Sequence, residues 1–91
     1  MKISKYQDAK FMRKYTMMRC AVCGRGHCHG HHLLEKSIYP ERRYSEENMI
    51  PLCPIHHGEA HQNKPEFTEW LRENKPAQHE WVEDHRHHRK E

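Results

Sequence analysis

The stretch "MIPLCPIHHGEAH", residues 49–61, contains a predicted strand, the start of a predicted helix and potential ligands for two metal ions. Pro54 suits the first turn of a helix, which the pattern predicts over residues 54–63. Residues four apart lie on one helix face, so His57 and His61 can bind a single ion. A strand, a helix and metal ligands in direct succession predict a small metal-binding fold.

A second set of ligands combines two short motifs. Cys20 and Cys23 form a C-x-x-C pair, and Cys53 and His56 form a C-x-x-H pair. The helical period turns His56 about 100° away from His57, so the two neighbouring histidines serve different sites. Three thiolates and one imidazole make a closed tetrahedral set that is typical of structural zinc. The predicted zinc would join the N-terminal segment to the strand–helix junction.

Cys28 is an alternative ligand for this zinc, because it lies only five residues after Cys23. An all-thiolate set would leave His56 unbound. We favour His56, since both pairs then have the two-residue spacing of a zinc knuckle. Cys28 is interpreted as a small buried residue with a free thiol.

The composition also favours stabilisation by metal. Only 34% of the 91 residues are apolar, which predicts one small domain with a thin core. Eleven His and four Cys accompany that thin core, and the cysteine spacing does not resemble a secreted disulfide framework. We find no export signal and no apolar run of membrane-spanning length, so we expect a reduced, cytoplasmic compartment.

The remaining segments alternate between predicted helices and strands. Residues 7–18 predict a helix with Asp8 as its N-cap, and residues 27–34 fit a strand. Residues 35–48 are polar and indicate a long loop. Pro51 places the strand of residues 49–53 at a sheet edge, because proline donates no backbone hydrogen bond.

The C-terminal third predicts one more helix and a charged tail. The helix covers residues 65–75, ends before Pro76 and buries one apolar face made by Phe67, Trp70 and Leu71. The tail is expected to fray, although Trp81 and Val82 can dock on the core.

The charge is concentrated at the N-terminus. Residues 1–19 carry six basic residues and one acidic residue, a net charge of +5, whereas the remaining chain has a net charge of −2. This basic helix can contact the phosphates of a nucleic acid. A solvated helix face explains the same charges equally well.

The stretch "HGHH", residues 29–32, supplies further histidines. Adjacent side chains on a strand point to opposite faces. If His31 joins His57 and His61 on an ion, His32 is not a fourth ligand and stays near the site to handle a proton. Three imidazoles that leave open positions are what a catalytic ion requires. His27 and His29 are interpreted as bystanders.

The motifs "CAVC", "HHLLEKS", "NMIPLC" and "HHGEAH", in this order, resemble the HNH endonuclease family, also called ββα-metal or His-Me finger nucleases. The resemblance covers residues 20–61. It implies an α+β fold in a single domain, residues 1–91, with a ββα-metal core over about 20–63, flanking helices and a structural zinc. The chain departs from the commoner pattern at His56, where many zinc-bearing members have cysteine.

The resemblance also implies the roles of individual residues. His31, His57 and His61 would bind the catalytic divalent cation, Mg²⁺ or Mn²⁺, and His32 would be the general base. Imidazole suits that role because it titrates near neutral pH. Asn48 would hold the long loop and so orient the base. The implied activity is hydrolysis of phosphodiester bonds, leaving 5′-phosphate and 3′-hydroxyl ends.

DNA is the partner that the resemblance suggests. Because nothing in the sequence resembles a second recognition domain, we expect weak sequence specificity. Lys36, Arg42 and Arg43 are candidate contacts to backbone phosphates, or equally solvated surface charges. The main alternative function is a non-catalytic, zinc-stabilised nucleic-acid-binding module. A zinc-stabilised interaction domain is the third functional hypothesis.

Overall fold

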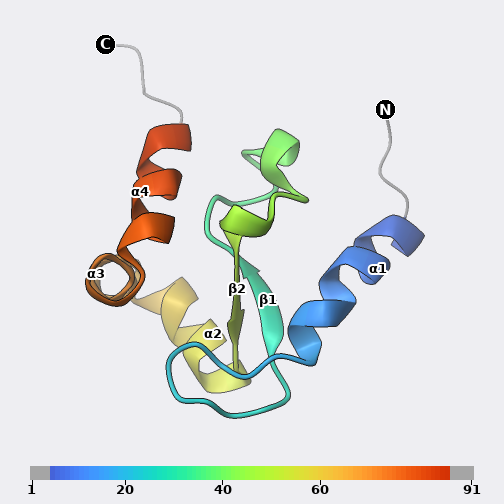
Figure 1. Ribbon diagram of the computed structural model, residues 1–91, viewed down its shortest axis with the longest axis horizontal. Coiled ribbons are helices and arrows are strands. Elements are labelled where there is room, and N and C mark those ends of the chain that lie inside the picture. The colour runs from blue at the N-terminus through green and yellow to red at the C-terminus, as the bar shows by residue number, and fades with distance from the viewer. Residues whose placement is uncertain (1–4, 87–91) are drawn as a thin grey trace.

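The structure is a computed structural model that describes residues 5–86, with side chains from residue 9 onward. The described chain is a small α+β structure with a two-stranded antiparallel sheet (Figure 1). Its elements are α1 (Lys5–Thr16), β1 (His29–His32), the short 3₁₀ helices η1 (Pro40–Arg42) and η2 (Glu46–Asn48), β2 (Met49–Leu52), α2 (Pro54–Gln62), α3 (Lys64–Asn74) and α4 (Pro76–His85).

The β1–β2 hairpin lies between α1 and α2, and both helices contact it (Figure 1). Gly30 is opposite Pro51 in the strand register and faces α1. A Cβ atom at Gly30 would lie 3.1 Å from Cβ of Tyr15 and 2.9 Å from Cε of Met49, so glycine permits the close approach of α1. Because side chains alternate along a strand, the odd-numbered histidines of β1 face α2.

The main core fills the space between the hairpin, α2 and α3. Leu52 is 0% exposed and Ile50 is 1% exposed, and both pack against Leu71 of α3. A second apolar cluster joins Leu34 and Tyr39 to Val82 of α4. The second cluster is therefore what attaches α4 to the segment that follows β1.

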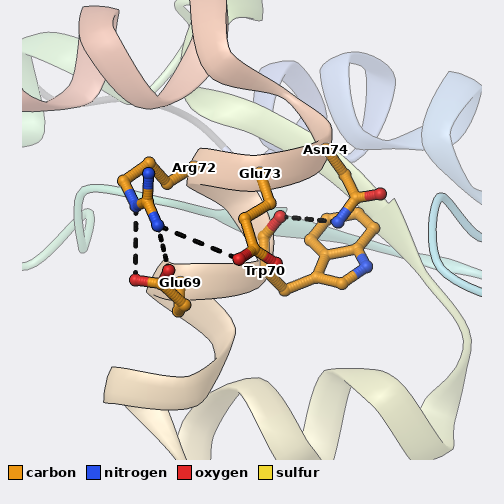
Figure 2. A network of polar contacts seen from close by, with 5 residues as sticks. All are labelled: Glu69, Trp70, Arg72, Glu73 and Asn74. Atoms are coloured by element: carbon orange, nitrogen blue, oxygen red, sulfur yellow. Dashed lines mark hydrogen bonds and ion pairs between the residues drawn. The ribbon is translucent and has the colours of Figure 1, made fainter.

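Proline lies in the first turn of α2, α3 and α4, where a missing backbone N–H costs least. The expected helices over 54–63 and 65–75 are each confirmed to within one residue. On α3, Arg72 pairs with Glu69 and lies 3.9 Å from Glu73, while Asn74 donates to the Trp70 carbonyl at 2.9 Å (Figure 2).

The N-terminal helix differs from the expectation at both ends. It spans Lys5–Thr16 rather than 7–18, so Asp8 lies within the helix and is not its N-cap. The helix ends at Thr16, and the two residues that follow it, Met17 and Met18, are 81% and 42% exposed. Their backbone amides close the last turn onto the carbonyls of Lys14 and Tyr15, each at 3.3 Å.

The sequence predicts no helix after Pro76 and a charged tail that frays, but Pro76–His85 form the helix α4. Pro76 both follows α3 and opens α4, because its fixed backbone angle suits a first helical turn. Val82 is buried and Trp81 packs beside it, as docking side chains would. Residues 87–91 lie outside the described residues.

The hairpin strands are shorter than expected. The first strand covers His29–His32 rather than 27–34, and the second covers Met49–Leu52, with Pro51 in a sheet of only two strands. The expected loop over 35–48 contains η1 and η2 and no longer element. Within residues 5–86, none of the helices has the length and apolar character needed to cross a membrane.

Replacing Leu52 with Ala is expected to lower the free energy of unfolding by about 2–5 kcal/mol, because it leaves a cavity at a side chain that is 0% exposed. Urea unfolding of the zinc-loaded protein measures this loss. Ile55→Ala is the control: its side chain is 55% exposed, so we expect a change below about 0.5 kcal/mol. Equal losses in the two variants would contradict the placement of Leu52 in the core.

Candidate functional site

One candidate site is the cluster of Cys20, Cys23, Cys53 and His56, which we call the cysteine cluster. Its four ligand atoms all lie within 4.8 Å of one another, close enough to hold a metal ion. The Sγ atoms of Cys23 and Cys53 are 3.8 Å apart, and Nδ1 of His56 is 3.2 Å from Sγ of Cys53. Zinc–sulfur bonds of 2.3 Å in a tetrahedron separate two sulfurs by about 3.8 Å, so the cluster is compatible with a structural zinc.

A tight turn brings the first two cysteines to β2. The backbone amide of Cys20 donates to the Arg25 carbonyl at 2.7 Å, and Gly24 closes the turn with a positive φ of 80°. The Ala21 amide donates to the Pro51 carbonyl at 2.9 Å. That bond fixes the turn against the strand that ends beside Cys53.

Two of the three thiols in the cysteine cluster, Cys20 and Cys53, favour the thiolate, which is the form that binds metal, whereas the pKa of Cys23 is raised. Burial would raise the pKa of Cys20, but backbone amides, including that of Cys53, hydrogen-bond its sulfur and bring the pKa down to about 6. The backbone amide of His56 lowers the pKa of Cys53. Two of the three cysteines therefore lose their protons more readily than an ordinary thiol.

Cys28 lies outside the cysteine cluster. It is 3% exposed, and its thiol donates to the Arg25 carbonyl at 3.4 Å. Burial raises the pKa of Cys28, which favours the neutral thiol. This geometry favours His56 over Cys28 as the fourth member of the cluster.

The second candidate site, which we call the histidine cluster, consists of His31 from β1 and His57 and His61 from α2. Their ligand nitrogens also lie within 4.8 Å of one another. The Nε2 atoms of His57 and His61 are 3.3 Å apart, and the three ring centroids are separated by 4.8–5.2 Å. Zinc–nitrogen bonds of about 2.05 Å in a tetrahedron separate two nitrogens by about 3.3 Å.

Two of the three imidazoles, those of His31 and His57, have lowered pKa values that favour the neutral form, which is the form that binds metal. Burial, followed by the nearby His57 and His61, lowers the pKa of His31 to about 3. Burial also lowers the pKa of His57. Neutral imidazoles keep their lone pairs available, so an ion need not displace protons from these two rings.

His32 follows His31 but does not join the histidine cluster. Its Nε2 lies 3.0 Å from the carbonyl oxygen of Arg43. A carbonyl oxygen only accepts, so Nε2 carries the proton in the neutral ring and Nδ1 carries the lone pair. The loop carbonyl thereby sets the tautomer of His32.

Asn48 holds the loop that supplies this carbonyl. Its side chain is 0% exposed; Oδ1 accepts from the Leu34 amide at 2.6 Å, and Nδ2 donates to the Leu34 carbonyl at 3.1 Å. Nδ2 also donates to the carbonyl of Arg42 at 3.2 Å. Asn48 therefore fixes the peptide next to the one that binds His32.

A cavity of about 520 Å³ lies beside these histidines. His31, His32 and His61 line it together with the apolar side chains of Leu34, Phe67 and Val82. Phe67 packs edge-on against the His31 ring at 5.6 Å. His32 and two members of the histidine cluster, His31 and His61, therefore border one cavity.

The three candidate phosphate contacts lie along the segment after β1. Lys36 is exposed, whereas Arg42 and Arg43 are half-buried. The Arg42 guanidinium lies 5.9 Å from the Trp81 ring centroid, a cation–π distance, and its Nε is buried without a hydrogen-bond partner in the described chain. Arg42 therefore packs against α4, and Lys36 is the most accessible of the three.

The sequence predicts that His29 belongs to neither site. In the structure its ring stacks on His57, with centroids 5.2 Å apart and 24° between the planes. The signal was present in the sequence, because His29 is two residues before His31 and so shares its face of the strand.

Removing one ligand of the cysteine cluster is expected to release its metal. Cys53→Ser should reduce bound zinc and lower the melting temperature by about 10 °C or more, because metal binding and folding are linked in small domains. Metal analysis of the purified protein and thermal unfolding measure both effects. Cys28→Ala is the matched control and should keep its zinc. Loss of zinc in the control would identify Cys28 as a ligand.

Acid is expected to destabilise the protein through His31. Its pKa is about 3 when folded and ordinarily 6.5, so the unfolded state binds more protons between these values. The free energy of unfolding should therefore fall as the pH drops below 6.5, by up to about 1.4 kcal/mol per pH unit. Urea unfolding is measured between about pH 6.5 and 5 with no metal ion in the histidine cluster. It compares wild type with His31→Leu, which has no imidazole to take up the proton. Identical slopes would contradict the assignment.

The chain was compared with family models, curated proteins and solved structures, and none of them matches it. The geometry of the two clusters, of His32 and of Asn48 therefore carries the functional argument.

Proposed function

We propose that this protein is a metal-dependent endonuclease or nickase of the HNH type that hydrolyses phosphodiester bonds in DNA. The observation that carries the proposal is the position of His32: it lines the same cavity as His31 and His61 of the histidine cluster, and a loop carbonyl sets its tautomer. The succession of β1, β2 and α2, with one ligand on the first strand and two on the helix, supports the proposed ββα-metal fold.

In this proposal His32 is the general base. Its Nδ1 lone pair accepts a proton from a water molecule, and the resulting hydroxide oxygen attacks the phosphorus atom. The bond between phosphorus and the 3′ oxygen breaks, leaving a 5′-phosphate and a 3′ oxygen that takes a proton from solvent. The Arg43 carbonyl keeps its hydrogen bond to Nε2 throughout and stabilises the charged ring.

His31, His57 and His61 are the residues that would hold the divalent cation, Mg²⁺ or Mn²⁺ by the family resemblance. When bound, the cation would neutralise charge on the phosphate and on the departing oxygen. The three ligand nitrogens lie within 4.8 Å of one another, and the 3.3 Å between Nε2 of His57 and Nε2 of His61 fits two ligands of one divalent ion. We propose that the cysteine cluster holds zinc and acts only in stability, because its four ligands leave no open position.

Asn48 acts as a positioning residue in this mechanism. It touches neither the water nor the phosphate, but its bond to the Arg42 carbonyl fixes the loop whose next carbonyl orients His32. Lys36 is the best-placed candidate for binding the DNA backbone, because its side chain is exposed at the segment that follows β1.

His32→Ala is expected to lower the rate of plasmid nicking by about 10²–10⁴-fold, the usual contribution of a general base. The assay uses supercoiled plasmid with Mg²⁺ or Mn²⁺, and EDTA should stop the reaction. His27→Asn is the matched control: His27 is an exposed histidine with a positive φ of 56°, a conformation that asparagine tolerates.

Full activity of His32→Ala would remove His32 from the mechanism. No cleavage by the wild-type protein with either ion, together with zinc in the cysteine cluster alone, would favour the non-catalytic nucleic-acid-binding module.

A further inference from the structure

We infer that His29 is a fourth imidazole ligand of the histidine cluster, able to close the site around a tetrahedral ion such as Zn²⁺. The inference rests on the ion site of the proposed function and concerns which ions that site accepts. It depends on four features: the strand face of His29, its contact with His57, its exposure, and the chemistry of the neighbouring donors.

The hairpin places His29 on the correct face. His29 pairs with Leu52 and His31 pairs with Ile50 in the antiparallel register, so both histidines point to the same side of β1. Their Cα atoms are about 6.6 Å apart by strand geometry, a separation that two imidazoles can span to reach one ion. His32, the neighbour of His31, instead directs its Nε2 to the Arg43 carbonyl and lies outside the histidine cluster.

The ring of His29 already touches a member of the cluster. Its centroid lies 5.2 Å from that of His57, the same separation that His57 has from His31. The two stacked rings are nearly parallel, so His29 must rotate its ring to direct a nitrogen at the ion. His29 is exposed, so its ring is not enclosed by the core.

The donor set favours an ion that binds imidazole. The cluster contains only nitrogen ligands, which suit zinc, nickel and copper, whereas Mg²⁺ prefers oxygen ligands in octahedral geometry. The 3.3 Å separation between Nε2 of His57 and Nε2 of His61 matches a tetrahedron. Three histidines leave one corner of that tetrahedron vacant, and His29 is the described histidine that stacks on the cluster from the strand.

A fourth protein ligand would change what the site can do. With His29 bound, all four tetrahedral positions are filled and no position is open to a phosphate oxygen. With His29 turned away, three ligands leave a position open. His29 thus determines whether a tetrahedral ion in this site is closed to substrate.

The test measures zinc binding to the full chain after one zinc has been loaded. A second zinc is titrated by calorimetry into wild type, His29→Ala and His29→Phe. The phenylalanine retains the stack on His57 but has no ligand nitrogen. His31→Ala identifies the binding event as belonging to this cluster, and His27→Asn is the matched control. Histidine-ring nitrogen NMR of the wild type reports whether the His29 ring binds the metal.

We expect both His29 variants to lose at least about tenfold in affinity for the second zinc, since even residues outside the ligand sphere cost 10–100-fold. The His29 ring nitrogen should shift on zinc binding, and His27→Asn should bind as wild type does. A smaller loss in either variant, or an unshifted His29 ring at saturation, overturns the inference. Failure to cleave plasmid would overturn the proposed function alone, because this test measures binding.

Discussion

The direct succession of β2 and α2 is the constraint on which both ligand clusters depend. Cys53 is the residue between the strand and the helix, and Pro54 begins the helix at once. The helical period then turns His56 and His57 about 100° apart. Two adjacent side chains can therefore serve two different ions, one with the C-x-x-C turn and the other with β1. An extra residue at this junction would change which side each histidine faces.

The two clusters differ in burial, and this difference separates their chemistry. Cys20 and Cys53 belong to the main apolar core, where a bound ion would add a crosslink between segments that already pack together. The histidine cluster instead borders a cavity, and His61 is exposed. A closed set of four ligands suits stability, whereas three ligands beside a cavity leave a position for substrate or for a further ligand. One small fold thus places two groups of residues that could hold a metal ion, one within the core and one beside a cavity.

The segment between the strands is held by polar contacts rather than by a sheet or a long helix. Asn48 is 0% exposed, and its amide group is satisfied by the backbone of Leu34 and of Arg42. A buried amide that makes these bonds specifies one loop conformation, because losing any of them leaves a polar group unpaired. The loop conformation that Asn48 specifies also orients His32, because the ring nitrogen of His32 binds the next carbonyl of the same loop.

The sequence by itself determined the order of the elements as far as α3 and the ligand pairs within each motif. The C-x-x-C, C-x-x-H and H-x₃-H spacings are local, and turn or helix geometry brings such residues together wherever the segment lies. The sequence did not determine that Asp8 lies inside a helix, that the C-terminal segment is helical, or that His29 contacts His57. These features depend on packing between segments, as the helix α4 depends on the burial of Val82. Local periodicity fixes which side chains share a face, but only packing between distant segments fixes which faces meet.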